Sequence, residues 1–165
     1  EHPVPEILVG NGRVRREVSV LQCLDLFARR ESVHWTCGTC HSAVTASKVL
    51  GVTRHPFVLI MHLQRFCFQG GVKTKRHDVV SFPSRDLVFF PNKGGAPLRY
   101  NLFAFIEHSG AVDEGHYVAV CHNPEAGAWL RFNDHVITPI GGSLPDTVRS
   151  AEVYMLFYQL QPDHV

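Results

Sequence analysis

The fold is decided by residues 100–117, which read YNLFAFIEHSGAVDEGHY. Residues 102–106 are apolar at every position, which is typical of a strand covered on both faces. A polar Ser-Gly pair at 109–110 ends this strand, and Gly115 comes directly before His116. Because glycine lets the backbone bend sharply, the sequence places the His116 imidazole at the mouth of a second strand, beside a loop.

A single histidine is a weak signal in a chain with 11 of them, but the next residues predict a partner for His116. Its strand continues to residue 121, residues 123–127 have the composition of a turn, and a further strand returns after them. Antiparallel register then places the residue opposite His116 at about position 133 to 135, where Asn133 and Asp134 lie. Directly opposed residues have Cβ atoms about 5 Å apart, so a hydrogen bond there would set the tautomer of the imidazole.

Composition excludes several classes of protein. The chain has 165 residues, a length that suits one domain or part of one, and its 45% hydrophobic content is enough for a packed core. A net charge of +1 argues against nucleic-acid binding, and no apolar run approaches the length of a membrane span. Five cysteines, an odd number, suit a reducing compartment, and we expect a cytoplasmic or nuclear protein.

The stretch at 100–117 resembles the histidine box of the ubiquitin-specific protease family, and two later stretches resemble further motifs of that family. Residues 129–134 look like its W-x-x-F-N-D, and residues 153–158 look like its closing strand. This combination is far more specific than any single motif. The matching residues of the first two motifs are Tyr100, Leu102, Ala104, Phe105, His108, Gly110, Gly115, His116, Tyr117, Trp129, Phe132, Asn133 and Asp134.

The resemblance implies an α+β fold, the papain-like cysteine protease fold of these enzymes, with a mainly antiparallel sheet and few helices. It assigns residues 1–165 to the C-terminal part of the catalytic domain. Residues 31–52 would form a finger-like region, and residues 53–162 the palm.

The resemblance also implies a function, that of a cysteine-type deubiquitinase that cleaves after the C-terminal glycine of ubiquitin. Its partners would be ubiquitin and ubiquitinated proteins, and catalysis would need no cofactor. His116 would be the general base, Asn133 its orienting partner and Asp134 an assisting acidic residue. The implied substrate-binding residues are His108, Ser109, Gly110, Gly115 and Tyr117.

The family's cysteine box, which delivers the nucleophile from the start of a helix, has no match in this sequence. Cys23 lies in a predicted helix over 19–29, but a cysteine next to Leu24 is more often a small buried hydrophobe. We therefore expect the nucleophile to come from another segment, and the missing initiator methionine indicates a processed chain or an excerpt. The alternative is a catalytically inactive ubiquitin-binding or scaffold module.

Cys37 and Cys40 have the spacing of half a tetrahedral zinc site. Four interpretations compete: an upstream pair completes the site, the site has decayed, His34 and His41 complete it, or the pair is redox active. The resemblance favours one of the first two, because the family's fingers carry two such pairs. A structural zinc ion bound in part by Cys37 and Cys40 is therefore the one metal expected.

The remaining predictions concern local structure. Arg65 is expected in a structural ion pair at the edge of the palm rather than as a surface cation, and the basic run at 73–76 is expected to be a solvated loop. The 19–29 helix has Ser19 as its N-cap and one apolar face. Further strands are predicted at 6–9, 44–52, 56–63, 79–83, 87–90 and 151–158, turns or loops at 10–12, 69–71 and 92–97, a strand continued through 136–137, and one helical turn at 143–149.

Overall fold

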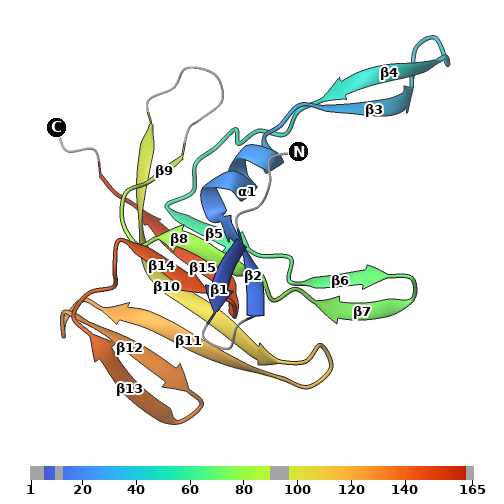
Figure 1. Cartoon of the computed structure of the whole chain (residues 1–165). Coiled ribbons are helices and arrows are strands. Elements are labelled where there is room, and N and C mark those ends of the chain that lie inside the picture. Colours follow the sequence, from blue (N-terminus) through green and yellow to red (C-terminus); the bar gives the residue numbers. More distant parts are fainter. Residues whose placement is uncertain (1–5, 10–12, 90–96, 163–165) are drawn as a thin grey trace.

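The computed structural model describes residues 6–9, 13–89 and 97–162. In this part the protein is mostly antiparallel β-structure with one helix, α1 (Val20–Phe27), which confirms the predicted α+β class (Figure 1). The strands are β1 (Glu6–Val9), β2 (Arg13–Ser19), β3 (Glu31–Thr36), β4 (Ala43–Lys48), β5 (Val58–His62), β6 (Phe66–Gln69), β7 (Val72–Lys75), β8 (Val79–Pro83), β9 (Leu87–Phe89), β10 (Leu98–Gly110), β11 (Gly115–Asn123), β12 (Ala128–Asn133), β13 (Val136–Gly141), β14 (Thr147–Ser150) and β15 (Val153–Leu160).

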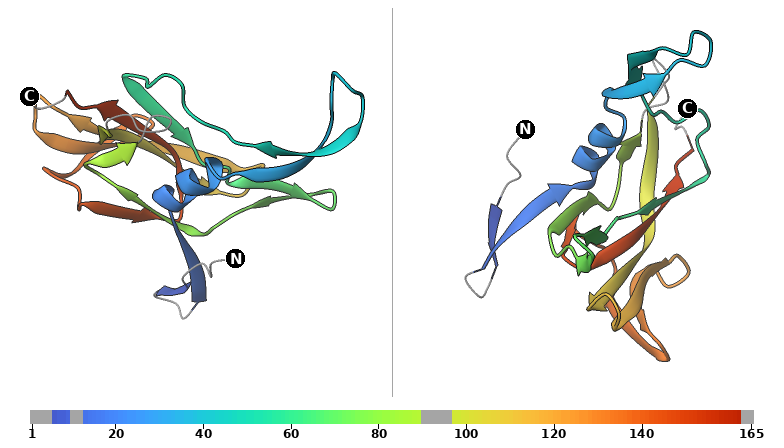
Figure 2. Two further views of the ribbon diagram at one scale, coloured as in Figure 1. Left: turned by 90° about the horizontal axis from the view of Figure 1, so that it is seen from above. Right: turned by 90° about the vertical axis from the view of Figure 1, so that its right-hand side faces the viewer.

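The main sheet has seven strands, with the order β13-β12-β11-β10-β15-β5 and with β9 also paired to β10. Its longest strand is β10, which has 13 residues and pairs with β11 on one side and β15 on the other. A second sheet has four strands in the order β1-β2-β8-β14. It lies on one side of the main sheet, next to α1 (Figure 2). The core lies between these layers, where the Phe105 ring packs against those of Phe82 and Trp129 at centroid distances of 5.6 and 6.4 Å.

Two hairpins project from this body, β3–β4 and β6–β7 (Figure 1). The first occupies most of the predicted finger-like region at 31–52. The second turns at Gly70 and Gly71, which both have positive φ, as the predicted turn at 69–71 requires.

Helix α1 begins as predicted but is shorter. The Ser19 side chain accepts a hydrogen bond from the Gln22 backbone, and the Gln22 side chain bonds back to Ser19, a capping box. The helix ends at Phe27 instead of Arg29. Val20 is buried and Leu24 packs against the core, whereas Leu21 and Phe27 of the predicted apolar face are exposed.

Two predictions near the C-terminus were wrong. Residues 136–137 do not continue the preceding strand, because Asp134 has a φ of 51° and reverses the chain into the separate strand β13. The predicted helical turn at 143–149 is instead extended, and Thr147–Ser150 pairs with β8. Pairing with a distant strand overrides local preference there. The predicted turn at 10–12 and most of the loop at 92–97 lie outside the described residues.

The prediction for Arg65 was also wrong. Its side chain is only 3% exposed, and it bonds backbone carbonyls rather than a carboxylate. Nε donates to Val153 O at 2.8 Å, and one terminal nitrogen donates to Asp78 O at 2.6 Å. Longer bonds reach Arg76 O at 3.4 Å and Ser150 O at 3.3 Å. One guanidinium therefore joins the base of the β6–β7 hairpin to the segments around β14 and β15.

The turn between β10 and β11 needs glycine at both ends. Gly110 has a φ of 89°, and a Cβ there would lie 2.5 Å from Glu114 O. A Cβ on Gly115 would lie 1.8 Å from Nε2 of His108, whose ring packs under the turn. The role predicted for Gly115 was to let the backbone bend. In the structure its main role is to leave room for the His108 ring.

We expect the substitution Arg65→Met to lower the free energy of unfolding by at least about 3 kcal/mol, because it leaves several carbonyls without their charged donor. Urea denaturation followed by circular dichroism measures the change. Arg99→Met is the matched control, since Arg99 forms an exposed ion pair with Asp86 at 3.5 Å, and such a pair contributes about 1 kcal/mol or less. Equal urea midpoints for the two variants would contradict the role given to Arg65.

We expect Gly115→Ala to cost about 1 to 3 kcal/mol of stability, because the new methyl group overlaps the His108 ring and neither the ring nor the strand has space to move without loss of packing. The control is Gly142→Ala, whose Cβ would meet its nearest neighbour, Gly127 O, at an ordinary 3.6 Å. Thermal unfolding of both variants provides the comparison. A Gly115→Ala protein as stable as the control would show that the overlap is relieved at no cost.

Candidate active site

His116 and Asn133 meet where two neighbouring strands of the main sheet begin and end. His116 is the second residue of β11, and Asn133 is the last residue of β12. Their strands pair in register, with Ala119 opposite Phe132. His116 Nε2 lies 2.5 Å from Asn133 Oδ1, so the contact predicted between the two side chains is present.

This contact determines the tautomer of the neutral imidazole. A carboxamide oxygen can only accept a hydrogen bond, so Nε2 of His116 must carry the proton. Nδ1 is then left with a free lone pair. The His116 side chain is 47% exposed, and an approaching group can therefore reach this base.

Asp134 lies at the edge of the pair. Its Oδ2 is 4.0 Å from His116 Nε2, and its side chain is 73% exposed. Water screens a charge this exposed, so its attraction to a protonated His116 is weak. The positive φ of Asp134 begins the reversal into β13, directly after the position that Asn133 occupies.

Aromatic rings support the turn that leads into His116. The His108 ring lies 4.6 Å from that of Tyr117 and 5.2 Å from that of Phe66, and Tyr154 completes the cluster. The sequence analysis missed Phe66 and Tyr154, since they come from distant strands and carry no local signal. Tyr117 is 51% exposed and forms the open side of the cluster.

The other predicted substrate-binding residues differ in exposure. His108 is only 3% exposed, and its Nδ1 has no hydrogen-bond partner in the described residues. Burial and the positive charge of Lys75 lower the pKa of His108, so the ring is held neutral. Ser109 is partly buried, while Gly110 and Gly115 lie at the surface of the turn. A contact of these residues with substrate stays a prediction.

The basic run at 73–76 is not a solvated loop. Lys73 and Lys75 lie on strand β7, and Nζ of Lys75 donates to His108 O at 2.6 Å and Gly110 O at 3.0 Å. The alternation of Lys73 and Lys75 after a Gly-Gly turn was the signal that could have indicated a strand with both side chains on one face.

None of the five cysteines forms a hydrogen bond with His116 within the described structure. Burial raises the pKa of Cys23 and of Cys121, which makes both thiols poor nucleophiles. Cys67 bonds Thr74 across the β6–β7 hairpin. The arrangement around His116 therefore contains an accessible imidazole bonded to a carboxamide, with no thiol bonded to it among the described residues.

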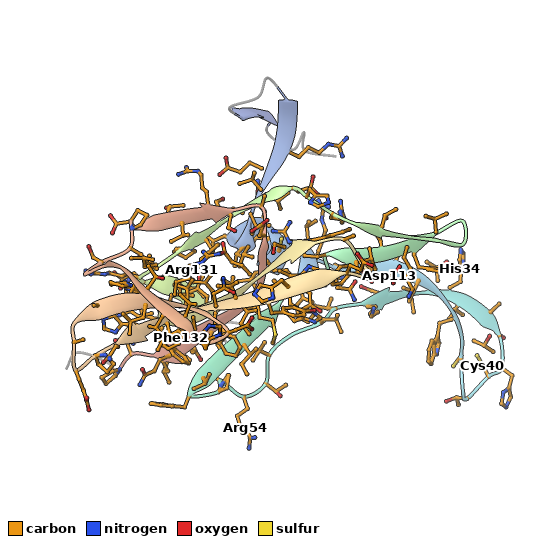
Figure 3. The ribbon with its side chains drawn as sticks, turned by 90° about the horizontal axis from the view of Figure 1, so that it is seen from below. His34, Cys40, Arg54, Asp113, Arg131 and Phe132 are labelled. Atoms are coloured by element: carbon orange, nitrogen blue, oxygen red, sulfur yellow. The ribbon has the colours of Figure 1, made fainter. Side chains whose placement is uncertain are left out.

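Cys37 and Cys40 lie in the turn between β3 and β4. Figure 3 shows Cys40 at the tip of this hairpin, away from the main sheet. Backbone N–H groups of Cys40 and Thr39 lower the pKa of Cys37 to about 7, which favours the thiolate that a metal ion requires. However, no group of three or more His, Cys, Asp or Glu side chains suited to a metal ion occurs in the described part. His34 and His41 therefore do not complete a site with the two thiols in this structure, and zinc binding by Cys37 and Cys40 stays a prediction.

No helix in the described residues is long and apolar enough to cross a membrane.

Comparisons with known proteins agree in sequence and in fold. A family model described as ubiquitin carboxyl-terminal hydrolase matches residues 12–158. Ubiquitin carboxyl-terminal hydrolase 2 of Rattus norvegicus is 35% identical over 150 residues, which are 87% of this chain and 24% of that protein. Ubiquitin carboxyl-terminal hydrolase 15 of Homo sapiens is 34% identical over 151 residues, 87% of this chain and 15% of that protein. The chain thus spans about a quarter or less of these relatives.

Solved structures show the same fold. A chain of the yeast SAGA DUB module superposes with a TM-score of 0.74 at 29% identity, covering 88% of this chain and 35% of that one. A chain of a SAGA DUB module bound to monoubiquitin gives 0.73 at 26% identity, covering 95% and 39%. These matches confirm the predicted ubiquitin-specific protease fold. The chain belongs to the ubiquitin carboxyl-terminal hydrolase family.

Proposed function

We propose that this chain supplies the general base and its orienting residue to a cysteine-type deubiquitinase, which hydrolyses the bond after the C-terminal glycine of ubiquitin. The observation that carries this proposal is the 2.5 Å contact between His116 Nε2 and Asn133 Oδ1 beside an exposed turn. In this proposal the nucleophilic cysteine comes from a segment other than residues 1–165. Membership of the family supports the reaction class.

The tautomer explains how His116 would act. Nδ1 takes the proton from the cysteine thiol, and the thiolate attacks the carbonyl carbon of the C-terminal glycine. The resulting imidazolium carries protons on both nitrogens, and Nδ1–H is given to the leaving amine as the thioester forms. Water then attacks the thioester after losing a proton to Nδ1, and the cysteine leaves as the thiolate. Asn133 keeps Nε2 occupied throughout, so the ring presents Nδ1 to the sulfur at each step.

The turn between β10 and β11 suits a slender substrate. Gly110 and Gly115 lie at its surface without side chains, and the half-exposed Tyr117 stands next to them. A chain end with two glycines could pass close to this backbone, whereas larger side chains would clash. Two related solved structures contain ubiquitin or ubiquitin aldehyde, which supports ubiquitin and ubiquitinated proteins as partners. We expect no nucleic-acid or membrane partner, and a cytoplasmic or nuclear location.

The proposed reaction uses no metal ion. A zinc ion would have a structural role at the tip of the β3–β4 hairpin, where Cys37 and Cys40 would supply two of its four ligands. Their knuckle is preformed, because Cys37 N donates to Ser42 O at 3.0 Å and His41 N donates to Cys37 O at 2.9 Å.

A second candidate is a non-catalytic ubiquitin-binding or scaffold module. It is favoured by one observation, the lack of a cysteine hydrogen-bonded to His116 among the described residues. The intact pair of His116 and Asn133 favours the enzyme, because a scaffold gains nothing from a fixed imidazole tautomer.

We expect the full-length protein to form a covalent adduct with ubiquitin that carries a C-terminal electrophile, and to release a fluorogenic amine from the C-terminus of ubiquitin. His116→Ala should lower kcat roughly 10²- to 10⁴-fold through loss of the base. Asn133→Ala should lower it by a smaller factor, since the base remains but its tautomer is no longer set. The change in fluorescence with time measures kcat and KM.

His122→Ala is the matched control, an imidazole six residues further along the same strand that stacks on Trp129 at a centroid distance of 5.4 Å. Its kcat should stay within about threefold of the unchanged protein, because His122 lies at the other end of β11. Binding of ubiquitin with neither adduct nor turnover would support the scaffold instead.

A further inference from the structure

Lys75 connects the β6–β7 hairpin to the turn that carries the catalytic histidine. We propose that Lys75 is a positioning residue: its ammonium holds the carbonyls of His108 and Gly110, which fixes the end of β10 at the β10–β11 turn and keeps the His116 ring in contact with Asn133. This inference rests on the proposed function of His116 as the base. Lys75 itself touches no reacting atom, so it would act through the backbone of the turn.

Hydrogen bonds hold the base of the β6–β7 hairpin, from which Lys75 projects; we call this base, residues 65–66 and 75–76, the platform. Phe66 is directly opposite Lys75 in the β6–β7 pairing, and Arg76 N donates to Arg65 O at 2.7 Å just beyond it. The buried Arg65 guanidinium ties this base to Val153 of β15. Lys75 therefore projects from a platform that is itself bonded to the main sheet.

Two contacts from this platform reach His108, near the end of β10. The Lys75 ammonium donates to His108 O, and the Phe66 ring packs edge-on against the His108 ring at 5.2 Å. The His108 ring occupies the space where a Cβ of Gly115 would stand. Movement of His108 would consequently be transmitted to Gly115 and to His116, the next residue.

The bond to Gly110 extends the contact of Lys75 to the last residue of β10, where the turn begins. Nζ of Lys75 lies 3.0 Å from Gly110 O, and Gly110 is the partner of Gly115 in the β10–β11 pairing. An ammonium has three donors, so one group can bond both carbonyls at once. Hydrogen bonds from a charged donor are stronger than neutral ones. A single side chain thus bonds the carbonyls of two of the last three residues of β10, His108 and Gly110.

Burial lowers the pKa of Lys75, the Glu152 carboxylate opposes this shift, and the charge of Arg65 adds to it. The backbone carbonyl of Glu152 accepts the His108 N–H at 2.8 Å, so both backbone polar groups of His108 are bonded. By contrast, Lys73 reaches the turn only through an ion pair with Asp113 at 3.7 Å, with side chains 62% and 82% exposed. Exposed pairs contribute little, so the two lysines of one strand should differ strongly in effect.

The test compares Lys75→Met with Lys75→Gln, which keeps a neutral donor, and with Lys73→Met and Arg99→Met as controls. Amide hydrogen exchange reports opening of residues 109–115, and nitrogen NMR of the His116 ring reports the fraction with the proton on Nε2. In Lys75→Met we expect exchange in the turn to be roughly tenfold faster or more, with a mixed tautomer. Lys75→Gln should show a smaller change of the same kind, and the two controls less than threefold.

Turnover provides the third readout. We expect Lys75→Met to lower kcat about tenfold with little change in KM, because the base spends less time in the productive orientation. Unchanged exchange and an unchanged His116 tautomer in Lys75→Gln would overturn the inference, even if Lys75→Met failed to fold. Exchange and tautomer need no turnover. A protein with no deubiquitinase activity, in which both still respond to Lys75, would refute the proposed function and leave the positioning role intact.

Discussion

The structure depends on a buried cation that bonds backbone instead of a carboxylate. Burying a guanidinium costs several kcal/mol unless its donors are satisfied, and Arg65 satisfies them with carbonyls of separate segments. Those segments are the ones that flank the β6–β7 hairpin and the start of β15. Arg65 O also accepts a bond from Arg76 N, next to Lys75, whose ammonium bonds His108 O; the His108 ring in turn lies against Gly115, the residue before His116. The same hairpin is thus tied both to the core and to the segment that carries His116.

The sequence predicted β10, β11, β12 and the His116–Asn133 contact because these follow from local pattern. Apolar runs, a turn by composition and antiparallel register were sufficient for β10, β11 and β12. The partners of Arg65 and Lys75 could not be predicted in the same way. Val153 lies 88 residues from Arg65, and His108 lies 33 residues from Lys75. A backbone carbonyl is present at every residue, so it leaves no mark in the sequence, and only the folded chain shows which carbonyls meet these cations.

The group that bonds the His116 ring, the Asn133 carboxamide, is neutral. Asn133 bonds the ring without adding a full negative charge, and the nearest carboxylate, Asp134, is exposed at 4.0 Å. The neutral Asn133 side chain sets which ring nitrogen carries the proton, and the exposed Asp134 carboxylate adds only a weak, water-screened attraction.

The anchoring of β12 by Trp129 restricts how this region can evolve. Trp129 and Asn133 are four residues apart on one strand and so share a face, and the indole is buried in the core. Insertion or deletion of one residue between them would move the carboxamide to the opposite face while the indole stayed in place. The turn at 123–127 contains neither residue of this pair, and its side-chain bonds are local, from Glu125 N and Ala126 N to Asn123 Oδ1. Length variation among descendants of this chain should accumulate there and be absent from the four-residue interval.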